Sequence, residues 1–224
     1  MRVISYDKET YNFHEIIKDL IGAGALEDLT AELNRDDDPE GKNSIYKNME
    51  QTDHYKKLYE KLDGEEGIKF YELFEKFVKN VIRPLYNESI YYQKKPTHRI
   101  HFHNSSGASR FHRDIDYGHS RVEVNYSVPQ TRMYNTNSIW IETKERKEDY
   151  RAIELKIGEC VEFHGAYLKH GAKENKTSDT RVSFDFRVMP KSEAPDIFTD
   201  KSTWEEKDED NPIFKNAHNF AICE

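Results

Sequence analysis

The segment FHRDIDYGH (111–119) holds two side chains that commonly bind metals, His112 and Asp114. On an extended chain, residues two apart point to the same side, so this imidazole and this carboxylate would face one target. A second imidazole, His170, follows His112 by 58 residues. Two imidazoles and one carboxylate can hold a single metal ion and leave further positions on it open. The spacing therefore predicts a metal site made of His112, Asp114 and His170.

This ligand set is typical of iron(II) sites in which three protein ligands occupy one face of the ion. The remaining positions can take a chelating 2-oxo acid and dioxygen. Arg181 follows His170 by 11 residues and begins the run Arg181-Val182-Ser183. A guanidinium at this place can bind the far carboxylate of the acid through two parallel hydrogen bonds.

The elements that position these residues are predicted to be short strands. After about residue 88, apolar side chains recur with a period of two in runs bounded by Gly, Pro, Asn and Asp. These runs are SIYYQ, THRIHFH, VEVNYSV, NSIWIE, RAIELKI, CVEFH and TRVSFDFRV. Many short strands at near-regular spacing indicate a sandwich or barrel.

Three of these runs have one wholly apolar face and one polar face. The polar faces carry Arg99, His101 and His103, then Glu123, Asn125 and Ser127, then Arg181, Ser183, Asp185 and Arg187. An ordinary sheet with this face in water would be expected to carry Lys and Glu on it. The residue types present instead favour a barrel with helices outside and a polar interior that binds a ligand.

The first 87 residues are predicted to be mainly helical. We expect a short strand at Val3, Ile4 and Tyr6, helices over 12–21, 25–35 and 69–86, and a loop over 36–44. The helix over 69–86 has an apolar stripe and should break at Pro84. Residues 191–224 are acidic and irregular, which predicts a tail or flap. No linker is visible, so we expect a single domain with a helical support region (1–87) and a β-core (88–190).

The β-core resembles the iron(II)/2-oxoglutarate-dependent oxygenases, whose core is a double-stranded β-helix, or jelly roll. The resemblance is carried by the pattern His-x-Asp, a distal His and Arg-x-Ser, and by the stretches RIHFHN, FHRDIDYGH, VEVNYSVP, TNSIWIE and TRVSFDFRV. The chain is similar to the small hydroxylases of streptomycin- and kanamycin-type antibiotic pathways over roughly residues 88–190. The expected fold class is thus mainly β with N-terminal helices and a jelly-roll core.

The resemblance implies that the catalytic centre is Fe(II) held by His112, Asp114 and His170. Halogenating members lack the metal carboxylate so that chloride can take its place, so Asp114 favours hydroxylation or a related oxidation over halogenation. Two alternatives stay open for the ligands. Asp116 is in phase with Asp114, and His164 precedes Gly-Ala as His170 does. His164 lies 17 residues before the arginine at 181, which is longer than the family spacing, and we favour His170.

The resemblance also implies how the co-substrate binds. Arg181 would take the C5 carboxylate of 2-oxoglutarate with help from Ser183, and Asn125 would contact the co-substrate or the substrate near the iron. Arg187 could replace Arg181, but the serine two residues after Arg181 favours Arg181. Three residues of the polar faces are predicted to bind the substrate: Arg99, His101 and Arg187.

The predicted activity is a dioxygenase that hydroxylates a small polar molecule, such as a sugar, aminocyclitol or amino acid derivative, and releases succinate and carbon dioxide. Two other classes stay open. One is a cupin-like binding protein or isomerase without redox chemistry. The other is a zinc hydrolase with the same ligands, for which Glu123 or Glu162 would be the catalytic carboxylate.

Composition excludes several partners. With 34 Lys+Arg against 42 Asp+Glu and a net charge of −8, we expect no nucleic-acid partner. No apolar stretch approaches the roughly 20 residues that span a bilayer, and no signal peptide is visible. Two cysteines fit a reducing, cytoplasmic setting. A second copy of the chain, forming a homodimer, is kept as a possible partner.

Overall fold

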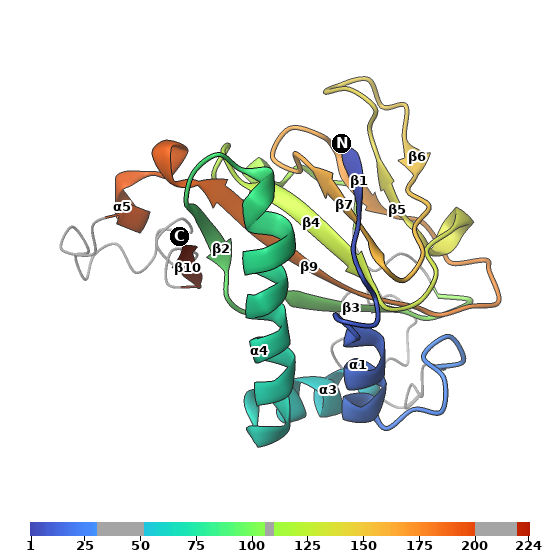
Figure 1. Ribbon diagram of the computed structural model, residues 1–224. Helices are drawn as coiled ribbons and strands as arrows, with labels where there is room; N and C mark the ends of the chain where they lie inside the picture. Colours follow the sequence, from blue (N-terminus) through green and yellow to red (C-terminus); the bar gives the residue numbers. More distant parts are fainter. Residues whose placement is uncertain (31–51, 106–109, 200–218) are drawn as a thin grey trace.

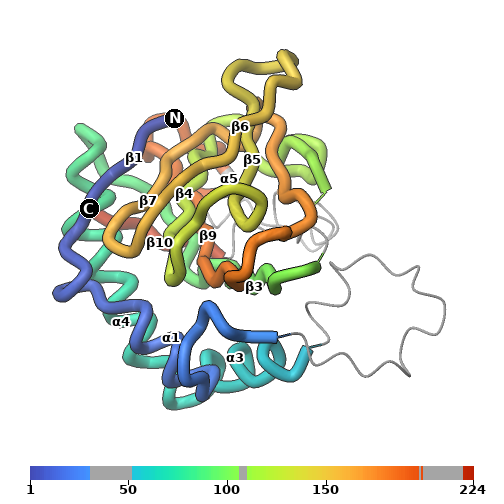
Figure 2. Tube along the Cα trace, turned by 90° about the vertical axis from the view of Figure 1, so that its right-hand side faces the viewer, coloured from blue at the N-terminus to red at the C-terminus, as the bar shows by residue number. Residues whose placement is uncertain are grey.

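The computed structural model describes residues 1–30, 52–105, 110–199 and 219–224. The chain is mainly β, as predicted, with most of its helix before residue 86 (Figure 1). Two antiparallel sheets lie against each other, and the long helix α4 covers the outside of the larger one. Figure 2 shows α4 on one side of strands β4 and β9, with β5 and β6 on the other.

The larger sheet has seven strands. Its order is β1 (Arg2–Ser5), β7 (Glu159–Phe163), β4 (Val124–Pro129), β9 (Arg181–Pro190), β2 (Ile90–Gln93) and β10 (Phe220–Cys223), and β3 (Thr97–His101) also pairs with β9. The smaller sheet has the order β6 (Arg151–Ala152), β5 (Ile139–Ile141) and β8 (His170–Ala172). All the pairings are antiparallel.

The helices are α1 (Phe13–Ile21), α3 (Asp53–Asp63), α4 (Ile68–Phe77) and α5 (Asp196–Thr199). Helix α4 continues into a π turn (Val78–Ile82) and a 3-10 turn (Arg83–Leu85), so the predicted helical segment is confirmed. Its regular α-helical part ends at Phe77, before Pro84. Four further 3-10 turns occur in the described residues: Glu65–Gly67, η5 (Asp114–Tyr117), Asn135–Asn137 and Lys191–Glu193.

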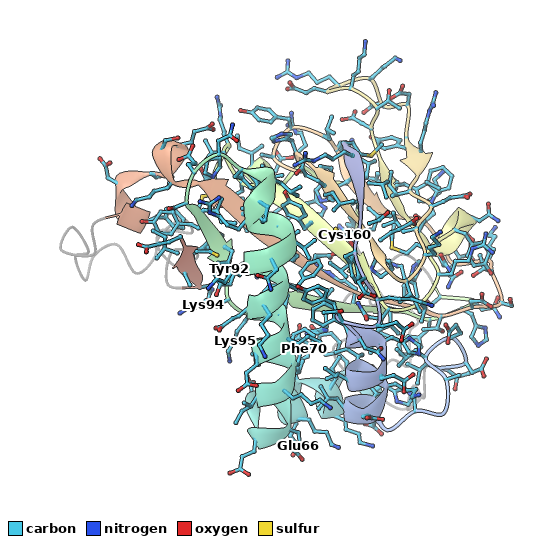
Figure 3. The ribbon with its side chains drawn as sticks, in the orientation of Figure 1. Glu66, Phe70, Tyr92, Lys94, Lys95 and Cys160 are labelled. Atoms are coloured by element: carbon cyan, nitrogen blue, oxygen red, sulfur yellow. The ribbon has the colours of Figure 1, made fainter. Side chains whose placement is uncertain are left out.

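The apolar stripe of α4 packs on the outer face of β9. Phe74 lies edge-on to Phe184 and Phe186, with ring centroids 5.9 and 5.0 Å apart. Phe74 also contacts Tyr92 of β2, and Figure 3 labels Tyr92 together with Phe70 of α4. Every second residue of β9 from Val182 to Val188 is fully buried here, as the alternation predicts. The other face of β9 is therefore free to line a site between the two sheets.

The helix predicted over 25–35 is wrong for residues 25–30, where the chain forms turns, and residues 31–35 lie outside the described residues. Gly22 ends α1 in a left-handed conformation, with φ 75°. The carbonyls of Glu27 and Leu29 then accept hydrogen bonds from Thr180 instead of from a following helical turn. Tertiary contacts thus override the local helical pattern. The loop predicted over 36–44 also lies outside the described residues.

Other differences from prediction concern weak patterns. The run RAIELKI forms only the two-residue strand β6 and an isolated bridge between Met133 and Leu155. No sequence pattern predicted α3, β8 or β10. The last of these pairs with β2, so the end of the predicted tail is a strand. The single domain with its three regions stays a prediction.

The two cysteines, Cys160 and Cys223, are both free, and Cys160 is fully buried, as expected of a small apolar side chain (Figure 3). None of the helices in the described ranges combines the length and the apolar character that crossing a bilayer requires.

Candidate metal centre

The three predicted ligands come together where the small sheet meets the turn η5. His112 and His170 form an isolated antiparallel bridge, each backbone N–H donating to the other residue's carbonyl at 2.9 and 2.8 Å. Asp114 begins η5 two residues after His112. One ligand atom from each residue lies within 4.8 Å of the others, and each Nε2 is 3.4 Å from Asp114 Oδ1.

The backbone fixes the proton position on both imidazoles. His112 Nδ1 lies 2.7 Å from the Arg110 carbonyl, and His170 Nδ1 lies 2.9 Å from the Leu168 carbonyl. A carbonyl only accepts, so Nδ1 carries the proton and Nε2 of the neutral ring presents a lone pair. Both lone pairs face the carboxylate oxygen of Asp114. Acceptors facing one another need a cation between them, and a donor hydrogen bond on Nδ1 is the usual support of a metal-bound imidazole.

The carboxylate of Asp114 is held by its other oxygen. Oδ2 accepts from Asn125 Nδ2 at 2.7 Å and from Arg187 Nε at 3.0 Å, which leaves Oδ1 facing the imidazoles. Burial alone would raise the pKa of this carboxyl. The imidazoles of His112 and His170, which donate to it when they are protonated in the metal-free protein, and the guanidinium of Arg187 outweigh burial and hold the pKa well below its usual range. Asp114 is therefore ionised. A set of two imidazole nitrogens and one carboxylate oxygen fits a divalent transition metal.

A cavity between the two sheets opens beside these ligands. The empty space in and around it, open solvent at its mouth included, is about 590 Å³. The polar faces of β3, β4 and β9 line it, as the alternation predicts, together with residues of β5, β7 and β8. The lining residues are Thr97, Arg99, His112, Asp114, Asn125, Ile139, Phe163, His170, Ala172, Arg181, Asp185 and Arg187.

Arg181 is a buried cation in this cavity. Its side chain is 2% exposed, and its Nη1 donates to Ser183 Oγ at 3.3 Å. Its Nε has no hydrogen-bond partner among the described residues. Burial lowers the pKa of Arg181 to about 10, although the carboxylate of Asp185 opposes this. A buried guanidinium without a carboxylate partner is costly, and an anionic ligand would satisfy it.

The residues predicted to bind substrate have different surroundings. Arg99 lines the cavity and pairs with Asp185 at 3.2 Å. Arg187 also lines it, but its Nε is engaged by Asp114, which distinguishes it from Arg181. His101 is buried beside the Asn137 carbonyl, at 3.4 Å, and is not among the lining residues.

The alternative ligands lie elsewhere. Asp116 accepts from Arg113 near the surface, at 3.1 Å, and His164 is exposed. Neither belongs to the cluster of His112, Asp114 and His170.

The two carboxylates considered for a zinc hydrolase are also outside the cavity lining. Glu123 is buried and accepts from the Ser120 N–H, with His119 and Arg187 beside it at 2.9 and 3.5 Å. Glu162 lies on the outer face of the sheet, where it pairs with Arg2. The geometry therefore offers no general base for a hydrolase from either residue.

Several site residues were missed from the sequence. Thr97, Ile139, Phe163 and Ala172 line the cavity without any motif that would single them out. Asp185 was placed on the polar face of its strand but given no role. Its Oδ1 is buried and has no hydrogen-bond partner in the part of the chain that the structure describes.

A curated protein with a similar sequence is the streptomycin biosynthesis protein StrG from Streptomyces griseus. It is 32% identical over 200 residues, which cover 84% of each chain. The chain belongs to the StrG family. The StrG relationship confirms the resemblance to a protein of a streptomycin-type pathway. No protein-family model matches this chain.

Solved structures give weaker likenesses. The non-heme monooxygenase ThoJ in complex with nickel and CytC3 with Fe(II) and alpha-ketoglutarate both have a TM-score of 0.47, at 12% and 13% identity, and each match covers 85% of this chain and 72% of the other. The alpha-ketoglutarate dependent epimerase SnoN from nogalamycin biosynthesis has a TM-score of 0.40 at 14% identity, over 53% of this chain and 58% of SnoN. The family assignment rests on StrG.

Proposed function

We propose that this protein is an Fe(II)- and 2-oxoglutarate-dependent dioxygenase that hydroxylates a small polar molecule, built on a double-stranded β-helix core. The observation that carries the proposal is the pairing of two features in one cavity. Three side chains that can bind a metal face one another at one place. Further along lies a buried arginine that has no carboxylate partner among the described residues.

His112, Asp114 and His170 would hold the iron through Nε2, Oδ1 and Nε2. When bound, the iron supplies dioxygen activation and C–H oxidation, coupled to conversion of 2-oxoglutarate to succinate and carbon dioxide. The protein holds both Nδ1 protons on backbone carbonyls, so each Nε2 stays available as a ligand. Because only three ligands come from the chain, positions remain for the co-substrate and dioxygen.

Arg181 would bind the far carboxylate of 2-oxoglutarate. It lies on the same face of β9 as Arg187, six residues away, and Arg187 contacts the metal ligand Asp114. Both arginines and the three metal-binding residues line the same cavity, so a dicarboxylate held at the metal would have its second carboxylate in the same cavity as the guanidinium of Arg181. Ser183 supports the guanidinium by accepting from it.

The substrate is proposed to be hydroxylated or amino-substituted. The cavity offers an arginine–carboxylate pair, Arg99 and Asp185, with one buried carboxylate oxygen to accept a donor. Groups of this kind reject a ligand that cannot hydrogen-bond to them, because they are left desolvated and unpaired. The StrG relative is a streptomycin biosynthesis protein, which supports a role in making a small polar natural product.

The test is a turnover assay with Fe(II), 2-oxoglutarate and a panel of sugars, aminocyclitols and amino acids. We expect succinate formation that needs Fe(II), and a product heavier by one oxygen atom for at least one substrate. Metal binding without any 2-oxoglutarate conversion across the panel would instead favour a binding protein or isomerase. Product formation without 2-oxoglutarate would contradict the proposal.

A further inference from the structure

Asp114 is held by a closed ring of three hydrogen bonds that includes no metal ligand other than itself. Its backbone N–H donates to the Gly165 carbonyl at 2.8 Å. The Gly165 N–H donates to Asn125 Oδ1 at 3.2 Å. Asn125 Nδ2 then donates to Asp114 Oδ2 at 2.7 Å, which closes the ring. We call this ring the Asn125–Gly165 clasp.

The clasp is buried and tightly packed. Asn125 is 5% exposed and Asp114 is 2% exposed. A Cβ added at Gly165 would lie 2.8 Å from Asn125 Oδ1 and 2.9 Å from both Cγ and Nδ2. Only glycine therefore lets the loop between β7 and β8 approach the amide this closely. The atoms in the way are the end of one side chain, so a larger residue would displace the amide before it disturbed the backbone.

Both polar atoms of the Asn125 amide are therefore hydrogen-bonded: the oxygen accepts from Gly165 and the nitrogen donates to Asp114. Asn125 and Arg187 together occupy Oδ2, so Oδ1 is the carboxylate oxygen left to face both imidazoles. A carboxylate fixed in this way binds a metal through one oxygen and keeps the other from chelating. This leaves the remaining positions on the metal open.

We propose that Asn125 and Gly165 are positioning residues that orient the carboxylate of Asp114 for one-oxygen metal binding. The proposal rests on the metal centre of the proposed function but not on the reaction. Gly165 acts through Asn125, since its N–H orients the amide and its lack of a side chain makes room for it. Outer hydrogen bonds of this kind are worth about 10–100-fold in metal affinity.

The test measures Co(II) affinity, as a redox-stable stand-in for Fe(II), by titration followed through the visible absorption of the bound metal. We compare wild type with Gly165→Ala, Asn125→Ala, the double variant and Gly24→Ala. Gly24 is the control because a Cβ there meets nothing within 4 Å. We expect each single site variant to bind Co(II) about 10–100-fold more weakly, with an altered visible spectrum, and Gly24→Ala to match wild type.

The double variant decides whether the two residues act together. If Gly165→Ala acts by displacing the Asn125 amide, it should cost little further affinity once that amide is removed, so the double variant should match Asn125→Ala. Unfolding midpoints are measured on every variant, so that a loss of fold is separated from a loss of affinity. If Gly165→Ala proves unfolded, Asn125→Ala alone must still show the loss while it remains folded.

Wild-type affinity in folded Gly165→Ala or Asn125→Ala, or losses that multiply in the double variant, would overturn the clasp while leaving the metal centre in place. Wild type that binds no Co(II) would overturn the metal centre itself, and the clasp with it. The two failures are therefore distinguishable.

Discussion

The two carboxylate oxygens of Asp114 have different neighbours. Oδ2 is taken by Asn125 and Arg187, and Oδ1 faces the two imidazoles. Arg181, further along the cavity, is buried, and its Nε has no hydrogen-bond partner within the described ranges. Arg181 and Arg187 lie on the same face of β9, but Arg181 donates to Ser183 whereas Arg187 donates to the carboxylate of Asp114.

We expect Arg181→Ala to weaken 2-oxoglutarate binding to the Fe(II)-loaded protein by at least about 30-fold. Removing one partner of a buried charge pair costs roughly 2–5 kcal/mol, and 1.4 kcal/mol is a factor of ten. Equilibrium binding under argon would measure it. Arg187→Ala is the comparison, because it should act first on the metal ligand. If Arg187→Ala weakened 2-oxoglutarate binding strongly and Arg181→Ala did not, the assignment of the clamp would be wrong.

Short motifs made part of this site predictable. His112, Asp114, His170 and Arg181 were found because their types and spacing carry the information, and the structure brings the first three together. The contact between Asn125 and Gly165 could not be predicted in the same way. It joins β4 to the loop between β7 and β8, across 40 residues, and depends on the absence of a side chain. No local pattern encodes such a contact.

At the scale of elements, one apolar stripe and one strand face account for most of the packing. The stripe of α4 and the outer face of β9 follow periods that were readable from the sequence. The turn at 25–30 was not, because its carbonyls are bound by Thr180, far along the chain. Helix α3 was also missed, because among its residues only Leu58 and Leu62 are buried apolar side chains.

We expect Phe74→Ala to lower the free energy of unfolding by about 3–5 kcal/mol, the usual cost of truncating a buried Phe. Phe74 is fully buried against Phe184, Phe186 and Tyr92. Urea denaturation would measure it. Ile68→Ala on the same helix is the matched control, because Ile68 is 55% exposed and should change stability by only about 0.5 kcal/mol. Equal effects at the two positions would show that the packing between α4 and β9 is not what stabilises this layer.

His98 gives this interface a pH dependence. It lies on β3 and packs against Phe70 of α4 and Phe184 of β9, and neither ring nitrogen has a hydrogen-bond partner among the described residues. Burial lowers the pKa of His98 to about 3, with Asp185 opposing. The unfolded chain therefore binds a proton below about pH 6.5 that the folded chain does not bind until about pH 3.

Stability should thus fall as the pH drops through this window, by up to about 1.4 kcal/mol per pH unit from this group. His98→Leu should remove that contribution, so the fall between pH 6 and pH 4 should be shallower by about that slope. Urea denaturation at several pH values would measure it. Parallel pH profiles for wild type and His98→Leu would contradict the prediction.

At the scale of the whole molecule, the two faces of the larger sheet have different roles: one packs against the helices and the other lines the cavity. The outer face and the helices hold the larger apolar cluster. The inner face and the small sheet enclose the polar cavity and a smaller apolar cluster. The covered face was predictable from alternation, and so was the polarity of the other. The closure of the cavity was not, because β8, a three-residue strand that carries His170, has too short a pattern to recognise.

Because Asp114 occupies the position that a halide would need, we expect oxygen insertion even with chloride in excess. The substrate panel is incubated with Fe(II), 2-oxoglutarate and chloride, and the products are analysed by mass spectrometry. A hydroxylated polar product is expected. A chlorinated product, or turnover only with lipids, would show that the cavity has been misinterpreted.

The central claim is that His112, Asp114 and His170 form a metal centre, and the most direct measurement is the stoichiometry of Fe(II) bound under argon. We predict about one Fe(II) per chain for wild type. Asp114→Ala and His170→Ala should bind none tightly while keeping the wild-type circular dichroism spectrum. Wild type that binds no Fe(II), or folded variants that bind it as wild type does, would contradict the claim.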